Sequence, residues 1–81
     1  MTITQTEERL FDYAAEIKKL EDIQLEYELR AQAEHLGTIR NQVAYAEETG
    51  NHQYELLRGD LYLTVQYIQI VAREIERRFI P

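Results

Sequence analysis

The chain of 81 residues contains no cysteine and no tryptophan, one proline and three glycines. The absence of cysteine excludes disulfide bonds, thiolate metal sites and thiol catalysis. A domain of this length buries only about 60% of the surface that its unfolded chain exposes, so its core is marginal. Small proteins without disulfides or metals rely on good helix packing or on association with another chain. Dimerisation is therefore expected from length and composition alone.

The chain also lacks long hydrophobic runs and an excess of positive charge. No apolar run approaches the roughly 20 residues of a membrane-spanning helix. The first eight residues lack the basic and apolar regions of a secretory signal, so we expect a cytoplasmic protein. The formal net charge of -6 argues against unaided binding to nucleic acid or to an anionic membrane, because both need a basic surface. Neither is expected as a direct partner.

The composition indicates long helices, because breakers are few and Glu, Leu, Ile, Gln, Arg and Ala are abundant. Thr4 and Glu7 have the spacing of a capping box, which marks a helix start. The next strong stop lies at 49–51, where Gly50 can adopt the left-handed conformation and Asn51 can cap a second helix. We predict one all-α domain over residues 1–81, a hairpin of helices at about 4–48 and 52–79.

The two predicted helices differ in length, roughly 65 Å against 42 Å at about 1.5 Å per residue. Either the first helix overhangs and another chain covers it, or it breaks near Gly37 to give three helices, with Thr38 capping a short middle one. The apolar positions favour a bend or a second contact surface, because two stripes point roughly a quarter-turn apart. The first stripe is Leu10, Tyr13, Ile17, Leu20 and Tyr27; the second is Leu25, Leu29, Leu36 and Val43.

Residues 61–71 are rich in β-branched and aromatic side chains and could be read as a strand. A strand would need a partner strand, and no other segment offers one. A set of residues at alternating spacings of four and three instead continues through the segment, which predicts a helix. This set is Leu57, Leu61, Thr64, Ile68, Val71 and Ile75.

The helix predicted at 52–79 is apolar around more than half of its circumference, so it needs at least two neighbours. The second neighbour is either a folded-over middle helix or another protomer, and we favour a two-fold dimer that completes a bundle. The predicted self-interface is Leu57, Leu61, Tyr67, Ile68, Val71 and Ile75. The predicted surface for another protein is Tyr62, Leu25, Leu29, Leu36 and Val43.

No residue cluster indicates catalysis, a metal or a cofactor. The Glu-x-x-His motif of di-iron bundles fails at His35, because residue 32 is glutamine. His52 and Glu55 have the reverse order and lie at a helix start. Adjacent carboxylates such as Glu47 and Glu48 point about 100° apart on a helix and do not converge. No nucleophile triad, phosphate-binding loop or H-E-x-x-H motif is present.

Three functions are compatible with this sequence. The leading hypothesis is a non-enzymatic interaction module, an adaptor, assembly factor or regulator, that acts as a homodimer and binds a larger protein. The second is an acidic inhibitor that occupies a basic groove of a nucleic-acid-processing protein. The third is a small all-helical enzyme with its site at the dimer interface, where Arg30 or Arg40 of both chains would converge.

Overall fold

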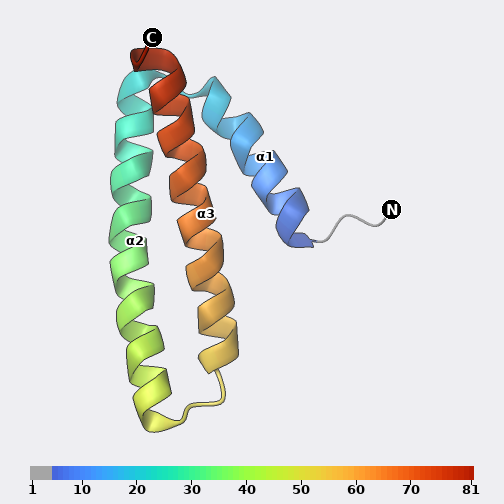
Figure 1. Cartoon of the computed structure of the whole chain (residues 1–81), viewed down its shortest axis with the longest axis vertical. Coiled ribbons are helices and arrows are strands. Elements are labelled where there is room, and N and C mark those ends of the chain that lie inside the picture. The colour runs from blue at the N-terminus through green and yellow to red at the C-terminus, as the bar shows by residue number, and fades with distance from the viewer. Residues whose placement is uncertain (1–4) are drawn as a thin grey trace.

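The computed structural model describes residues 5–81 and contains three helices, α1 (Gln5–Lys19), α2 (Asp22–Thr49) and α3 (Tyr54–Phe79). Helices α2 and α3 form an antiparallel hairpin, and α1 lies beside the C-terminal half of α3 and diverges from it toward the N-terminus (Figure 1). The all-α prediction is confirmed, and residues 61–71 are helical. Thr4, the first residue of the predicted capping box, lies outside the described residues.

The first predicted helix is interrupted at residues 20–21, so the alternative with three helices is confirmed, but its position for the break, near Gly37, is wrong. The last turn of α1 is tightened by a hydrogen bond from the Leu20 amide to the Ile17 carbonyl. Glu21 then adopts an extended conformation as the N-cap of α2, and its N–H donates to Gln24 Oε1 at 2.8 Å. This glutamate-to-glutamine spacing satisfies a donor at the new helix start, as in a capping box.

Gly37 remains inside α2 because one glycine costs a helix only about 1 kcal/mol. Packed residues follow it, with Ile39 and Ala46 buried on the same helix. The Thr38 hydroxyl donates to the Glu34 carbonyl, so it bonds back into the helix instead of capping a new one. The local glycine penalty is therefore outweighed by the packing of the residues around it.

The turn between α2 and α3 follows the predicted stop signal. Gly50 adopts φ 67° and ψ 28°, and its N–H donates to the Ala46 carbonyl, which ends α2. The Asn51 side chain accepts the Gln53 N–H at 2.8 Å and stabilises the turn. Helix α3 begins at Tyr54, two residues later than predicted.

The glycines of α2 and of the turn predict opposite effects of the same substitution. A Cβ at Gly37 meets nothing within 4 Å, so Gly37→Ala should raise the free energy of unfolding by about 1 kcal/mol. Gly50 also has open space, but its positive φ strains any L side chain, so Gly50→Ala should lower it by about 1 kcal/mol. Urea denaturation of both variants measures this difference, and shifts of equal sign would contradict it.

The core joins all three helices through Ile17, Leu25 and Val71, each at most 2% exposed. Helix α3 contacts both α1 and α2 and is the central element. The apolar circumference of α3 requires a second neighbour, and α1 is that neighbour along the C-terminal half of α3. None of the described helices is long and apolar enough to cross a membrane.

Candidate interaction surfaces

A polar junction holds α1 against the other two helices. The Tyr13 hydroxyl donates to Glu28 Oε1 at 2.6 Å, and Gln32 Nε2 donates to the same oxygen at 3.1 Å. The ring centroids of Tyr13 and Tyr67 lie 4.2 Å apart. Burial, followed by the contact with the Glu28 carboxylate, raises the pKa of Tyr13 well above its ordinary value, so the hydroxyl keeps the proton that it donates. The junction is a docking contact for α1.

An ionic cluster at the C-terminal end of α3 holds the end of α1 and the start of α2 against α3. Glu74 is 5% exposed and accepts two hydrogen bonds from Arg77, at 2.8 and 2.6 Å. Arg78 donates to Glu74 at 2.9 Å, to Asp22 at 3.1 Å and to the Lys18 carbonyl at 3.1 Å. Arg78 thus links the last turn of α1 and the first turn of α2 to the end of α3.

Because of this cluster, we expect the folding stability of the chain to depend on pH in the acidic range. The two hydrogen bonds from Arg77, and then the one from Arg78, lower the pKa of Glu74 from 4.5 to about 2. Since the folded-state pKa is the lower one, the stabilisation is present above about pH 4.5 and is lost as pH falls toward about 2. We expect Glu74→Gln to melt at a lower temperature at pH 7 and to lose less stability than the wild type between these pH values. Glu76→Gln, an exposed control on the same helix, should retain the wild-type slope.

The predicted self-interface is divided between the interior and the surface. Val71 is 0% exposed within the single chain, so its assignment to the self-interface is wrong. It points between α1 and α2, where Ile17 and Leu25 contact it. Tyr67 is half-buried and its ring faces α1. The remaining members are half-buried on α3: Leu57, Leu61, Ile68 and Ile75.

The predicted surface for another protein is likewise divided. Leu25 is 1% exposed and belongs to the core, so its assignment to a partner surface is wrong. The sequence could not reveal this burial, because it results from α1 folding back over α3. Tyr62 is 58% exposed, which agrees with its expected outward position. The other members are half-buried on α2: Leu29, Leu36 and Val43.

Leu29 and Ile75, one residue from each predicted set, line the same hollow between α2 and α3. This hollow of about 430 Å³ also has Phe79 among its lining residues. Leu29 and Ile75 pack against the core as well. Since successive residues on a helix are 100° apart, Ile68 points about a quarter-turn away from Tyr67, whose ring faces α1. We name as the open face six apolar residues of the hairpin that are half-buried: Leu29, Leu36 and Val43 of α2, and Leu61, Val65 and Ile68 of α3.

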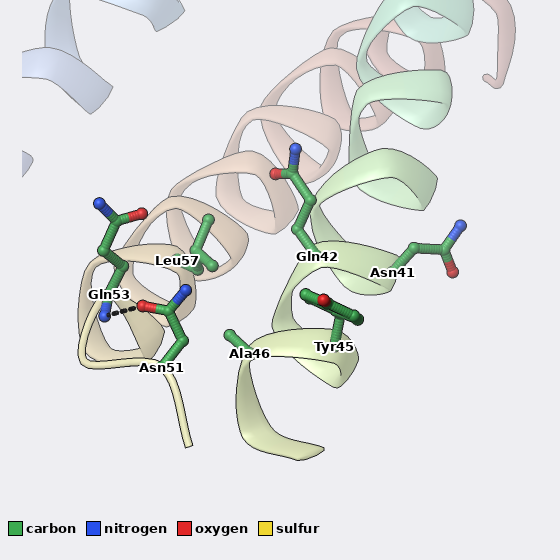
Figure 2. Close-up of a pocket in the computed structure, with 7 residues that line it drawn as sticks. All are labelled: Asn41, Gln42, Tyr45, Ala46, Asn51, Gln53 and Leu57. Carbon is green, nitrogen blue, oxygen red and sulfur yellow. Dashed lines mark hydrogen bonds between the residues drawn. The ribbon is translucent and has the colours of Figure 1, made fainter. Parts of the chain in front are cut away.

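A second hollow, of about 400 Å³, lies near the turn (Figure 2). Ala46 and Leu57 form its apolar part, and Asn51 and Gln53 border it from the turn. The other lining residues are Asn41, Gln42 and Tyr45 of α2. The polar lining is amide and phenol, with no carboxylate or histidine to act as a general acid or base near neutral pH.

Residues 5–81 contain no group of three or more His, Cys, Asp or Glu side chains that could hold a metal ion. His35 and His52 are both exposed. The charged side chains that matter structurally are Glu28, Glu74 and Arg78, whose roles were not predicted. Glu28 contacts Tyr13, and Arg78 contacts Asp22 and Lys18, over long stretches of sequence, so only the tertiary structure identifies these two roles. Glu74 contacts Arg77 and Arg78 at helical spacings of three and four residues, but its burial is visible only in the structure.

Comparisons of the chain with family models, with curated proteins and with solved structures found no match.

Proposed function

We propose that this chain is a non-enzymatic helical interaction module that acts as a homodimer, with the open face as its self-interface. The observation that carries the proposal is a set of apolar residues on both helices of the hairpin that the single chain leaves only half-buried. Its members repeat at seven-residue spacing, as Leu29, Leu36 and Val43 on α2 and as Leu61 and Ile68 on α3. This spacing is typical of helices that pack against further helices.

The dimensions of the chain support an additional neighbour. Its accessible surface is 6399 Å², whereas a folded monomer of 9.7 kDa has about 5100 Å². Its radius of gyration is 14.7 Å, against about 11.7 Å for a compact domain of this length. The excess surface, about 1300 Å², exceeds the roughly 800 Å² that each partner buries in a standard interface. A second copy on the open face is a low-cost way to cover it.

The proposal is tested by the solution mass of the full chain, measured by light scattering over a range of protein concentrations in low and high salt. We expect a dimer whose mass does not change with salt, because apolar packing is not screened. A monomer at all concentrations would refute the homodimer. A dimer that dissociates as salt rises would place the contact on charged residues instead of the open face.

The non-enzymatic part of the proposal rests on the chemistry of the hollows. The hollow at the turn has amide and phenol groups. The hollow between α2 and the end of α3 is mainly apolar, and its two carboxylates, Asp22 and Glu26, are ion-paired with Arg78 and Arg30. Arg30, expected at a dimer-interface active site, is paired with Glu26 at 2.9 Å and is well exposed. An adaptor or assembly factor needs no more than such surfaces. The cytoplasmic location stays a prediction.

A further inference from the structure

Helix α3 carries a second line of residues at heptad spacing, distinct from the open face. Leu56, Leu63, Ile70 and Arg77 are seven residues apart, and Gly59, Gln66 and Arg73 alternate with them. We name these seven residues the outer seam. Spacings of three and four residues place them along one side of the helix, over about 32 Å. A seam of this kind fits another helix.

Helix α1 covers only one flank of the seam, near its C-terminal end. There Ala14, Ile17 and Lys18 of α1 and Ile70 of α3 are among the residues that line a hollow of about 250 Å³. Because α1 diverges from α3 toward its own N-terminus (Figure 1), the other end of the seam is uncovered. Leu56 at that end is 73% exposed.

The middle of the uncovered part has room for a close approach. Gly59 lies in helical conformation inside α3, where glycine is unfavourable by about 1 kcal/mol relative to alanine. A Cβ at this position meets nothing within 4 Å. The packing of the chain itself therefore does not require glycine here. A helix crossing at Gly59 could approach the α3 backbone closely.

The covered end of the seam is positively charged, although the chain as a whole is negative. The charged residues that line the hollow are Lys18, Arg73, Arg77 and Glu74, three cations and one anion, a local net charge of +2. Arg77 is occupied by Glu74. The side chains of Lys18 and Arg73 have no ionic or hydrogen-bonding partner within residues 5–81. Although the protein has a net charge of -6, these two cations lie beside the apolar residues Ala14, Ile17 and Ile70 and are complementary to carboxylates of a partner.

We propose that the outer seam binds an amphipathic helix of another protein, whose apolar residues lie over Leu56, Gly59 and Leu63 and whose carboxylates reach Lys18 and Arg73. The heptad spacing specifies a helix, and the cations specify an acidic end. This proposal rests on the function proposed above, an interaction module, and names the chemistry of its partner. Tyr62, one turn from Gly59, borders the seam and is available to the bound helix.

The probe is a fluorescent synthetic peptide of about three heptads, with leucine at the a and d positions. Two versions are made, one with glutamates in the N-terminal turn and one with glutamates in the C-terminal turn, so that both orientations on the seam are tested. We expect one orientation to bind the full chain, more weakly as salt rises. Arg73→Glu should weaken binding about tenfold or more, because it replaces attraction by repulsion. Arg40→Glu makes the same charge change on α2, away from the seam, and should leave the affinity unchanged.

A second variant separates docking from folding. Gly59→Gln should raise the melting temperature, since glutamine is a better helix former, and should abolish peptide binding by filling the seam. Gly37→Gln, the matched control on α2, should also raise the melting temperature and should still bind. Absence of binding in both orientations, or binding insensitive to Arg73→Glu and Gly59→Gln, would overturn the seam.

The outcomes also distinguish the seam from the homodimer. If Gly59→Gln reduces the light-scattering mass of the chain itself, a second copy occupies the seam, and its assignment to another protein is wrong. If the wild type is monomeric but binds the peptide as described, the seam is supported and the homodimer is refuted. If the wild type is dimeric and binds no peptide, the homodimer stands and the seam fails.

Discussion

Ile68→Asp should convert the proposed dimer to a monomer and lower the free energy of unfolding by about 2–5 kcal/mol, the range for truncating large core side chains. Ile68 is half-buried on the open face, between α2 and the proposed second copy. The substitution removes apolar contact and adds a carboxylate that has no lysine or arginine three or four residues away on α3. Desolvating an unpaired charge is costly, so both the dimer and the hairpin should weaken.

The matched control is Gln69→Asp, which adds the same charge one residue further along α3. Gln69 is exposed and points about 100° away from Ile68. We expect its free energy of unfolding to stay within about 0.5 kcal/mol of the wild type, as for most surface substitutions, with the mass unchanged. Light scattering and urea denaturation report the two quantities. A folded dimeric Ile68→Asp protein at micromolar concentration would remove the open face as the self-interface.

Leu25→Ala should destabilise the chain by about 2–5 kcal/mol, because it leaves a cavity among Ile17 and Val71. A chain of this length has about 4–12 kcal/mol in total at 0.05–0.15 kcal/mol per residue, so the loss is a large part of its stability. The expected result is a lower urea midpoint and a fraction of unfolded protein at room temperature.

Ile23→Ala provides the control for the burial of Leu25. Ile23 lies two residues earlier in α2 and is 53% exposed, whereas Leu25 is 1% exposed. The exposed substitution should cost less than about 0.5 kcal/mol. If both variants lost the same stability, Ile23 would be covered in solution, and the division between core and surface at the start of α2 would need revision.

Local residue chemistry predicted several elements correctly. The helix over residues 61–71 was predictable because its apolar positions recur at three and four residues, and no second strand was available to pair with it. The stop at Gly50 was predictable because glycine adopts positive φ without the steric cost that other residues incur. These features depend on residues within a few positions of one another.

The break in the first predicted helix shows where local reasoning fails. The quarter-turn between the two apolar stripes was visible in the sequence, and the structure places that change of direction at residues 20–21. The break was predicted near Gly37 because glycine is the weakest helix former apart from proline. Glu21 and Gln24 were present as a start signal in the sequence. Glutamate is, however, not among the residues preferred at the N-cap, which are mainly serine, threonine, aspartate and asparagine.

The sequence by itself determined the helical class, the hairpin turn and the need of α3 for more than one neighbour. These follow from periodicity, from backbone propensity and from the amount of apolar surface on one helix. The tertiary structure decided which neighbour meets that need along the C-terminal half of α3. Folding α1 back buries Leu25 and Val71, and it leaves the open-face residues half-buried and Leu56 of the outer seam exposed. The burial of a residue depends on how all three helices pack together. Such packing brings together residues far apart in the sequence, such as Arg78 and Asp22, which are 56 residues apart.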